Sequence, residues 1–410
     1  MNSTEIFTIA LNLGLPWYIK NINMIRKSET FAGQMDIYID FKVGSKFKDL
    51  TGTDCPVYDT VEKTWQHLNF FEHKCYLHAR VPRITTSDGR VEQVNVPWAR
   101  PQSGFTLLFE AFSMLLIESE MPVSRAAKIL KIYDTRLWRI FKFWLSKALS
   151  ADDQSEVVNI GIDETSSKKG HNYVTVAVDM DARRVIFAKR GKDASLLSEI
   201  KNHLQRKGCN SEQIKNISMD MSPAFISGAM SNFPKAAITF DKFHIMQLIN
   251  KAMDDVRKYE RKQHIELKNY KYLFLKNSEN LSDEEYYAIS NFTNLYKELG
   301  EAYRLKELFR ELWDIEQIEG ATEYLEGWCY LADNSEIVPF MNISKTIKSH
   351  WSGILNYFKS GLNNGILEGI NSKIQLAKKR ARGFRNIDNF ILMIHFVAGK
   401  LKFDYPFYLM

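Results

Sequence analysis

Residues 157–179 read "VVNIGIDETSSKKGHNYVTVAVD": an apolar run, a polar and basic turn, and a second apolar run. A third run, "RRVIFAK" at 183–189, follows after a short turn. Apolar runs that are rich in Val and Ile and bounded by polar turn residues are typical of β-strands, and short turns join antiparallel neighbours. This stretch therefore predicts a three-stranded antiparallel meander whose first strand ends at Asp163.

The segments that follow the meander alternate between helix and strand. The pattern predicts helix 193–208, strand 213–220, helix 222–233, strand 236–241 and helix 242–262. Pro223 directly after Ser222 suits a helix start, and Gly208 suits a helix end. The order βββαβαβα is the skeleton of a ribonuclease H-like domain, so we predict an α/β fold with a mixed sheet.

Acidic residues stand where the predicted strands end. Asp163 and Asp220 close the first and fourth strands, which are neighbours in this skeleton, and Glu368 lies on a later helix in "GILEGINSKI". Taken singly, such acids are turn residues, helix caps or surface acids. Together they form a triad in which like charges raise one another's pKa. Two Mg²⁺ or Mn²⁺ ions would remove this conflict and catalyse phosphodiester displacement, so we predict the three acids as catalytic metal ligands.

A helix-turn-helix is predicted in "MPVSRAAKILKIYDTRLWRIFKFWLSKAL" at 121–149. Ser124 and Thr135 are the expected caps of its two helices, with a tight break at "KIYD" between them. The buried face of the second helix is expected to be formed by Leu137, Trp138, Ile140, Phe141 and Trp144. The length and spacing match a DNA-reading unit, and the alternative is a plain pair of packed helices. The basic residues expected to face DNA from the second helix are Arg136, Arg139 and Lys142.

Residues from about 260 to 350 are charged and helical in pattern, which predicts a large helical insertion. The tryptophans of this part of the chain, Trp313, Trp328 and Trp351, are core residues or contacts to distorted DNA, and the core interpretation is preferred. Beyond the insertion, the segment "KIQLAKKRARGFRN" contains no acid. A basic stripe beside the third acid is well placed to hold a DNA backbone. The residues predicted to do so are Lys373, Lys378, Lys379, Arg380, Arg382 and Arg385.

The composition excludes several classes of protein. The chain has 410 residues, 45% of them hydrophobic and 25% charged, which is typical of globular proteins. The formal net charge of +6 is compatible with a polyanionic partner. The longest apolar run, 105–117, is too short to span a bilayer and contains Glu110. The N-terminus lacks a secretory pattern and the four cysteines are scattered. We therefore expect a cytoplasmic protein with no membrane partner.

Several long blocks of the sequence carry a family resemblance. These blocks are "IGIDETSSKKGHNYVTVAVD", "ISMDMSPAFISGAM", "ITFDKFHIMQLINKAMDDVRK" and "ILEGINSKIQLAKKRARGFRN", with "DCPVYDTVEKTWQHLNFFEHKCYLHARVPRI" and "VPWARPQSGFTLLFEAF" before them. In this order they resemble the ISL-three family of bacterial insertion-sequence transposases over nearly the whole chain. The resemblance implies that Asp163, Asp220 and Glu368 correspond to the family's DDE triad.

The motif "DKFH" at 241–244 resembles the D-x-x-H motif of transposases with helical insertions. It implies a catalytic role for His244, which would contact the scissile phosphate or hold Asp241 in place. The alternative is a structural histidine at a helix start. Asp241 also rivals Asp220 as the second metal ligand, because both end strands. Asp220 is preferred, since the fourth strand neighbours the first.

The N-terminal region departs from the family pattern, in which paired C-x-x-C knuckles bind zinc. Here "CPVY" keeps Cys55 but has Tyr58 at the second knuckle position. A candidate zinc site remains, formed by Cys55, Cys75 and His78 with His67 or His73 as a fourth ligand. The alternative is that the cysteines are small buried apolar residues. Either way, a small zinc-ribbon-like unit that binds DNA is expected.

Five regions follow from these patterns. They are a zinc-ribbon-like unit at 1–100, a helix-turn-helix at 101–152, the first part of the catalytic core at 153–259, a helical insertion at 260–350, and the completion of the core at 351–410.

The resemblance implies a transposase that binds terminal inverted repeats and catalyses strand cleavage and transfer. Its cofactor would be Mg²⁺ or Mn²⁺, and it would act on DNA as a homo-oligomer. One alternative is a catalytically silent DNA-binding descendant, which the intact acids disfavour. Another is a different ribonuclease H-like nuclease, which the helix-turn-helix and the insertion disfavour.

Overall fold

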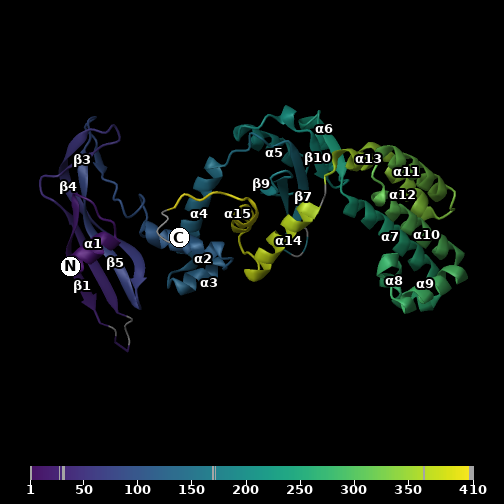
Figure 1. Ribbon diagram of the computed structural model, residues 1–410, viewed down its shortest axis with the longest axis horizontal. Helices are drawn as coiled ribbons and strands as arrows, with labels where there is room; N and C mark the ends of the chain where they lie inside the picture. The colour runs from purple at the N-terminus through teal and green to yellow at the C-terminus, as the bar shows by residue number, and fades with distance from the viewer. Residues whose placement is uncertain are drawn as a thin grey trace. The chain divides into compact units, whose positions relative to one another are not determined.

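The computed structural model describes residues 2–26, 28–29, 33–168, 170, 172–362 and 365–405. The chain forms two compact units (Figure 1). The first contains the described residues up to Ser150 together with those from Lys402 onward, and the second is Ala151–Leu401. Within the described ranges, no helix has the length and apolar character needed to cross a membrane.

The N-terminal part of the first unit is a six-stranded sheet, which does not confirm the prediction of a small zinc-ribbon-like unit. Helix α1 (Ser3–Ala10) precedes the strands β1 (Trp17–Ile25), β2 (Gln34–Phe41), β3 (Lys46–Lys48), β4 (Asp54–Phe70), β5 (His73–Thr85) and β6 (Val91–Gln93). Their order is β1-β2-β5-β4-β3, with β6 also on β5. Alternate residues such as Cys75, Leu77, Ala79 and Val81 pack into one aromatic-rich core, as period-two burial requires.

Three helices follow the sheet, at the predicted helix-turn-helix: α2 (Leu107–Glu118), α3 (Val123–Ile129) and α4 (Asp134–Ala151). The predicted caps are wrong. Helix α3 starts directly after Pro122, so Ser124 is already helical. Helix α4 starts at Asp134, whose carboxylate suits the positive end of a helix, and Thr135 lies inside it. The predicted buried face of α4 is confirmed, with Ile140 and Trp144 in the core.

The second unit contains the predicted meander. Its strands are β7 (Asn159–Lys168), β8 (Asn172–Asp179), β9 (Arg184–Arg190), β10 (Asn216–Met219) and β11 (Ala237–Phe240). The sheet order is β11-β10-β7-β8-β9. Strands β7, β8 and β9 are antiparallel neighbours, whereas β10 lies parallel to both β7 and β11. The expected adjacency of the first and fourth strands is therefore confirmed.

The prediction that the first strand ends at Asp163 is wrong. Strand β7 continues to Lys168, and Asp163 pairs with Val176 of β8. Polar residues in the predicted turn have partners that make an extended conformation favourable. The Ser167 hydroxyl donates to the carbonyl oxygen of Asn172, and Thr165 accepts a side-chain hydrogen bond from Gln375. What stops near Asp163 is the pairing with β10, not the strand itself.

Helices cover both faces of this sheet (Figure 1). Helices α5 (Ser195–Arg206), α6 (Pro223–Asn232) and α7 (Lys242–Glu260) contribute to one apolar core with the side chains of Ile160 and Ile162. On the other face, α14 (Gly365–Arg380) and α15 (Ile387–Ala398) pack on Val174 and Val176. The sheet is the middle layer of three.

The insertion is helical, as predicted. It contains α8 (Lys271–Leu275), α9 (Asp283–Leu295), α10 (Lys297–Glu311), α11 (Ile318–Asp333) and α12 (Val338–Ser349), followed by α13 (Trp351–Ser360). Short 3-10 turns of the insertion lie at Ile265–Asn269, Ser278–Asn280 and Leu312–Asp314, and a further one, Ser211–Gln213, precedes β10. Trp313 and Trp328 are buried, which confirms the core interpretation for them, and Trp351 is half-buried against the same core. Helix α13 lies on β11, where the Asn356 side-chain amide donates to the carbonyl oxygen of Ile238 at 2.8 Å.

The contact between α13 and β11 requires a glycine at position 353. A Cβ atom there would lie 2.2 Å from Cε2 of Phe240, whose ring is buried. We expect Gly353→Ala to lower the free energy of unfolding by about 1–3 kcal/mol, the usual cost of overpacking. Urea denaturation would measure it. Gly327 in α11 has no neighbour within 4 Å of the same position, so Gly327→Ala should stabilise by about 0.5–1 kcal/mol. Equal effects of the two changes would contradict this packing.

Candidate active site

Three aspartates lie at one level of the second sheet: Asp163 within β7, and Asp220 and Asp241 directly after β10 and β11. Strand β10 pairs with β7 so that Ser218 faces Gly161, and with β11 so that Met219 faces Phe240. Both registers, continued past the ends of β10 and β11, put Asp220 beside Asp163 on one side and Asp241 on the other. Carboxyl ends of parallel strands are where α/β proteins build ligand sites.

The Asp163 carboxylate is held on both oxygens. Oδ1 accepts the backbone N–H of Glu164 at 2.7 Å, and Oδ2 accepts the Asn371 side-chain amide at 2.5 Å. Burial raises the pKa of Asp163, and the nearby carboxylates of Asp241 and Asp220 raise it further. The Glu164 amide and the His244 imidazole lower that pKa. The group therefore lies in a crowded acidic environment that would favour a bound cation.

The other two aspartates also serve local backbone geometry. Asp220 accepts the N–H of Ser222 at 2.9 Å in the turn before α6. Asp241 is buried and caps α7 by accepting the N–H of Phe243 at 2.7 Å. Nε2 of His244 lies 3.9 Å from the Asp241 carboxylate, and the His244 side chain is 31% exposed. A capping role and a place in the acidic cluster are compatible, because capping uses only one carboxylate oxygen.

Glu368 comes from a different part of the chain. It is exposed on α14, three residues before Asn371. Residues three apart on a helix are neighbours, so Glu368 lies one turn from the side chain that contacts Asp163. The described residues contain no group of three His, Cys, Asp or Glu side chains arranged to hold a metal ion. The strand registers place Asp163, Asp220 and Asp241 at neighbouring positions, and Glu368 lies on the helix whose Asn371 contacts Asp163.

Sequence reasoning missed two residues of this region. Glu164 is half-buried, and burial raises its pKa. Lys192 lowers that pKa, whereas Asp220 and Asp163 raise it. In the sequence, the position of Glu164 directly after Asp163 indicated that it belongs to this region. For Asn371, which donates a hydrogen bond to Asp163, the sequence offered only a weak indication, namely its position one helical turn after Glu368.

The predicted DNA-binding residues differ in exposure. On α4, Arg139 is exposed, while Arg136 and Lys142 are half-buried. The Arg136 guanidinium lies 4.2 Å from the centre of the Phe105 ring, a cation–π contact. On α14, Lys378 is half-buried and donates to the carbonyl oxygen of Ser166 at 2.6 Å. The remaining basic residues of this stripe are exposed: Lys373, Lys379, Arg380, Arg382 and Arg385.

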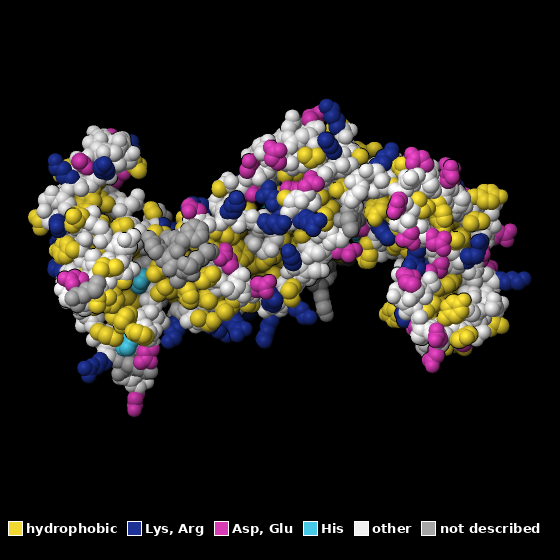
Figure 2. All heavy atoms as spheres, viewed as in Figure 1, with side chains coloured by type: hydrophobic (Ala, Val, Ile, Leu, Met, Phe, Trp, Pro, Cys, Tyr) yellow, Lys and Arg dark blue, Asp and Glu magenta, His cyan; other side chains and the backbone are white. Residues whose placement is uncertain are grey.

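The charged side chains of the second unit are unevenly distributed. Figure 2 shows Lys and Arg side chains gathered over the region where Figure 1 draws α14 and α15. Asp and Glu side chains are more frequent over the helices of the insertion. The basic region is therefore the face of this unit that suits a polyanion.

The zinc site predicted from Cys55, Cys75 and His78 is wrong. Cys55 lies at the start of β4, where it pairs with Phe47, whereas Cys75 faces His67 near the other end of that strand. At about 3.3 Å per residue, the two cysteines are separated by roughly 40 Å. Both thiols are buried, and burial raises the pKa of Cys75 to about 12. They are apolar core residues, as the alternative interpretation held.

Two of the candidate histidines, His67 and His78, have structural partners, whereas Nδ1 of His73 is buried without a hydrogen bond among the described residues. Nε2 of His78 contacts Asp36 at 2.8 Å, and its Nδ1 contacts the Thr64 hydroxyl at 2.9 Å. His67 bonds the hydroxyl of Thr106, which caps α2. Burial lowers the pKa of His67 to about 4, so its ring is neutral. These rings join strands to one another and to α2, which explains their presence without a metal.

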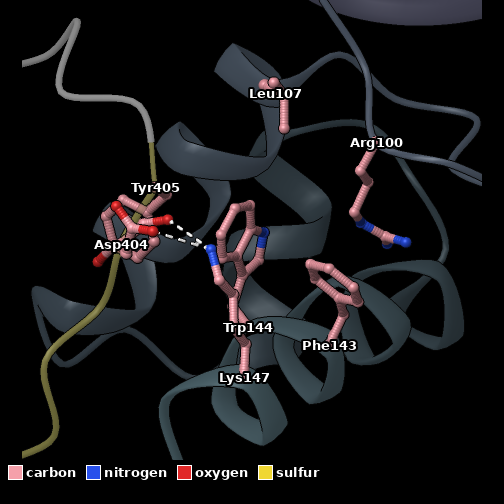
Figure 3. A pocket seen from close by; sticks show the side chains of 7 residues that line it. All are labelled: Arg100, Leu107, Phe143, Trp144, Lys147, Asp404 and Tyr405. Atoms are coloured by element: carbon pink, nitrogen blue, oxygen red, sulfur yellow. Dashed lines mark hydrogen bonds and ion pairs between the residues drawn. The ribbon is translucent and has the colours of Figure 1, made fainter. Parts of the chain in front are cut away.

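A pocket of about 440 Å³ lies in the first unit (Figure 3). Its lining comes from α4, the start of α2 and the chain near residue 404. Lys147 forms an ion pair with Asp404 at 2.9 Å, and Arg100 stacks on Phe143 at 4.0 Å. None of the predicted site residues lines this pocket. Lys147 is paired with Asp404, and Arg100 and Trp144 donate to Glu110, which lies outside the lining.

Comparison with known proteins gives the family. The sequence matches the ISL3 model of DDE transposases, described as a transposase, over residues 160–394. It also matches the helix-turn-helix domain of transposase family ISL3 over residues 94–145. The transposase for insertion sequence element IS1001 of Bordetella parapertussis is 24% identical, over 92% of this chain and 95% of that protein. The transposase for IS1557 of Mycobacterium tuberculosis is 25% identical, over 79% of each chain. The chain therefore belongs to the ISL3 (ISL-three) family of insertion-sequence transposases, with a helix-turn-helix region and a DDE transposase region.

Proposed function

We propose that this transposase binds the terminal inverted repeats of its element and cleaves DNA at the acidic cluster of the second unit. The observation that carries the proposal is the common level of Asp163, Asp220 and Asp241 on the neighbouring strands β7, β10 and β11 and their ends. The sheet order β11-β10-β7-β8-β9, with β7–β9 antiparallel, supports a ribonuclease H-like assignment for this unit.

The donor atoms of the cluster fit a hard divalent cation. They are carboxylate oxygens, which Mg²⁺ and Mn²⁺ prefer, and Asp163 lies among neighbouring carboxylates that raise its pKa. We assign Asp163, Asp220 and Glu368 as the ligands, with Asp241 as the rival of Asp220. When bound there, a pair of such ions supplies activation of the attacking hydroxyl and stabilisation of the leaving oxygen.

The remaining residues position the substrate and the acids. His244 is partly exposed beside Asp241, so its ring is available to donate to a phosphate oxygen. The exposed basic side chains of α14 would hold the DNA backbone near Glu368. On α4, Arg139 is the exposed candidate for contact in the major groove. Joining two element ends would require at least two copies of the chain, and the site of action would be the bacterial cytoplasm.

The test uses the full-length protein and a labelled duplex that carries the inverted repeat flanking the gene. With Mg²⁺ or Mn²⁺ in excess over the protein, we expect nicking at the repeat end. Excess EDTA should abolish nicking and leave binding in a mobility-shift assay largely intact, because phosphate contacts by Lys and Arg need no metal. A duplex with a scrambled repeat is the control for specificity.

Two results would contradict the proposal in different ways. Binding to the repeat without nicking under either metal would favour a catalytically silent DNA-binding protein. If nicking does not depend on the repeat sequence, or is faster on RNA–DNA hybrids, the result would indicate that the protein is a different nuclease with a ribonuclease H-like fold.

A further inference from the structure

Helix α14 runs along strand β7, and its side chains contact the strand at regular intervals. Leu367 packs against Gly161, where a Cβ atom would lie 2.8 Å from the leucine Cδ2 atom. Four residues on, Asn371 donates to Asp163, and four residues further Gln375 donates to Thr165 at 2.7 Å. Four helical residues rise about 6 Å and two strand residues about 6.6 Å. Each helical turn therefore meets the next residue on the same face of β7.

This alignment has consequences for two of the acids. Gly161 lets the helix approach, because a larger residue would collide with both Leu367 and Met180. The amide of Asn371 then reaches the Asp163 carboxylate, and Glu368 lies on the same helix, three residues before Asn371. The polar contacts of Gln375 and Lys378 with residues 165 and 166 extend the alignment beyond the acids.

We propose that Asn371 is a positioning residue that orients the Asp163 carboxylate for a divalent cation and ties the helix of Glu368 to it. This inference rests on the proposed function. The Glu164 N–H and the Asn371 amide each use one lone pair of a different Asp163 oxygen, so each oxygen keeps a second lone pair for a metal. A neutral amide also orients the carboxylate and leaves its negative charge in place, whereas a lysine would neutralise that charge. Hydrogen-bond donors to metal-binding carboxylates typically contribute 10–100-fold to affinity.

The test measures Mn²⁺ binding to the full chain without DNA, by the electron paramagnetic resonance signal of the free ion. Asn371→Leu is nearly isosteric and lacks the donor, and Asn371→Ser is too short to reach Asp163. Both should weaken the site that Asp163→Asn removes by about 10–100-fold. The matched control is Asn356→Leu, which breaks an amide tether from α13 to the same sheet but to a backbone carbonyl. It should leave Mn²⁺ affinity unchanged.

A second readout separates positioning from general damage. In repeat-end nicking, the Mg²⁺ concentration for half-maximal rate should rise about 10–100-fold in Asn371→Leu, while most of the maximal rate returns at saturating Mg²⁺. Thermal melts would verify folding of each variant, and Asn371→Ser serves if the leucine variant is unfolded. Wild-type affinity in both Asn371 variants would overturn the inference and leave the proposed function standing. If Asp163→Asn binds Mn²⁺ as wild type does, the metal site and the inference fall together.

Discussion

Asp163→Asn is expected to reduce repeat-end nicking by about 10³-fold, the upper end of what loss of one electrostatic contact in an active site costs. The substitution keeps the shape of the side chain and removes its charge. Asn371 and the Glu164 N–H would then contact an amide in place of a carboxylate. The cation would lose a charged ligand, and the new side chain would not be oriented as the carboxylate is. Single-turnover nicking of the inverted-repeat duplex would measure the loss, with mobility shifts to show that DNA binding persists.

Companion variants assign the remaining ligands. Glu368→Gln should lose as much nicking activity as Asp163→Asn. Asp220→Asn should lose more of this activity than Asp241→Asn. The reverse order would make Asp241 the second ligand. The control is Asp181→Asn in the turn between β8 and β9, where the carboxylate accepts from Asn159 at the start of β7. If Asp181→Asn lost as much activity as Asp163→Asn, the effect would reflect folding and not the site.

Glu110→Ala is expected to destabilise the helix-turn-helix region by about 3–5 kcal/mol, the usual cost of removing one partner of a buried charge pair. The Glu110 side chain on α2 has no exposed surface. It accepts from Arg100 at 2.9 Å, from the Ser103 hydroxyl at 2.6 Å and from Nε1 of Trp144 at 2.9 Å. Alanine would leave a largely buried guanidinium and a buried indole N–H without their acceptor.

Hydrogen exchange measured by mass spectrometry would localise this effect, since peptides from α2 and α4 should lose protection by about two to three powers of ten. Glu110→Gln keeps one acceptor oxygen and should fall between alanine and wild type. Asp59→Ala is the control, because its ion pair with Arg83 is exposed and such pairs contribute little. Unchanged protection of α2 and α4 in Glu110→Ala would show that the buried network is not what holds these helices together.

Local sequence pattern predicted the elements that depend on short-range physics. Alternating and continuous apolar runs identified five strands of the second unit in the order in which they occur. Helical periodicity identified α4 and its buried face. The acids were found in the same way, because Asp220 and Asp241 directly follow the last residues of β10 and β11. These signals are strong where one face of an element is buried and its period is regular.

The sequence failed where a partner distant in the chain decided the outcome. The turn predicted after Asp163 is strand because α14 and β8 supply partners for Thr165 and Ser167. The separation of Cys55 from Cys75 follows from the length of β4, which no spacing rule for zinc ligands anticipates.

By itself, then, the sequence determined the order of elements, the acids at the strand ends and the family to which the blocks belong. Only the tertiary structure decided that Asn371 reaches Asp163 across 208 residues of chain. That contact depends on a glycine at 161 and on the matched rise of a helix and a strand. Such a match is a property of two packed elements, and neither segment alone contains it.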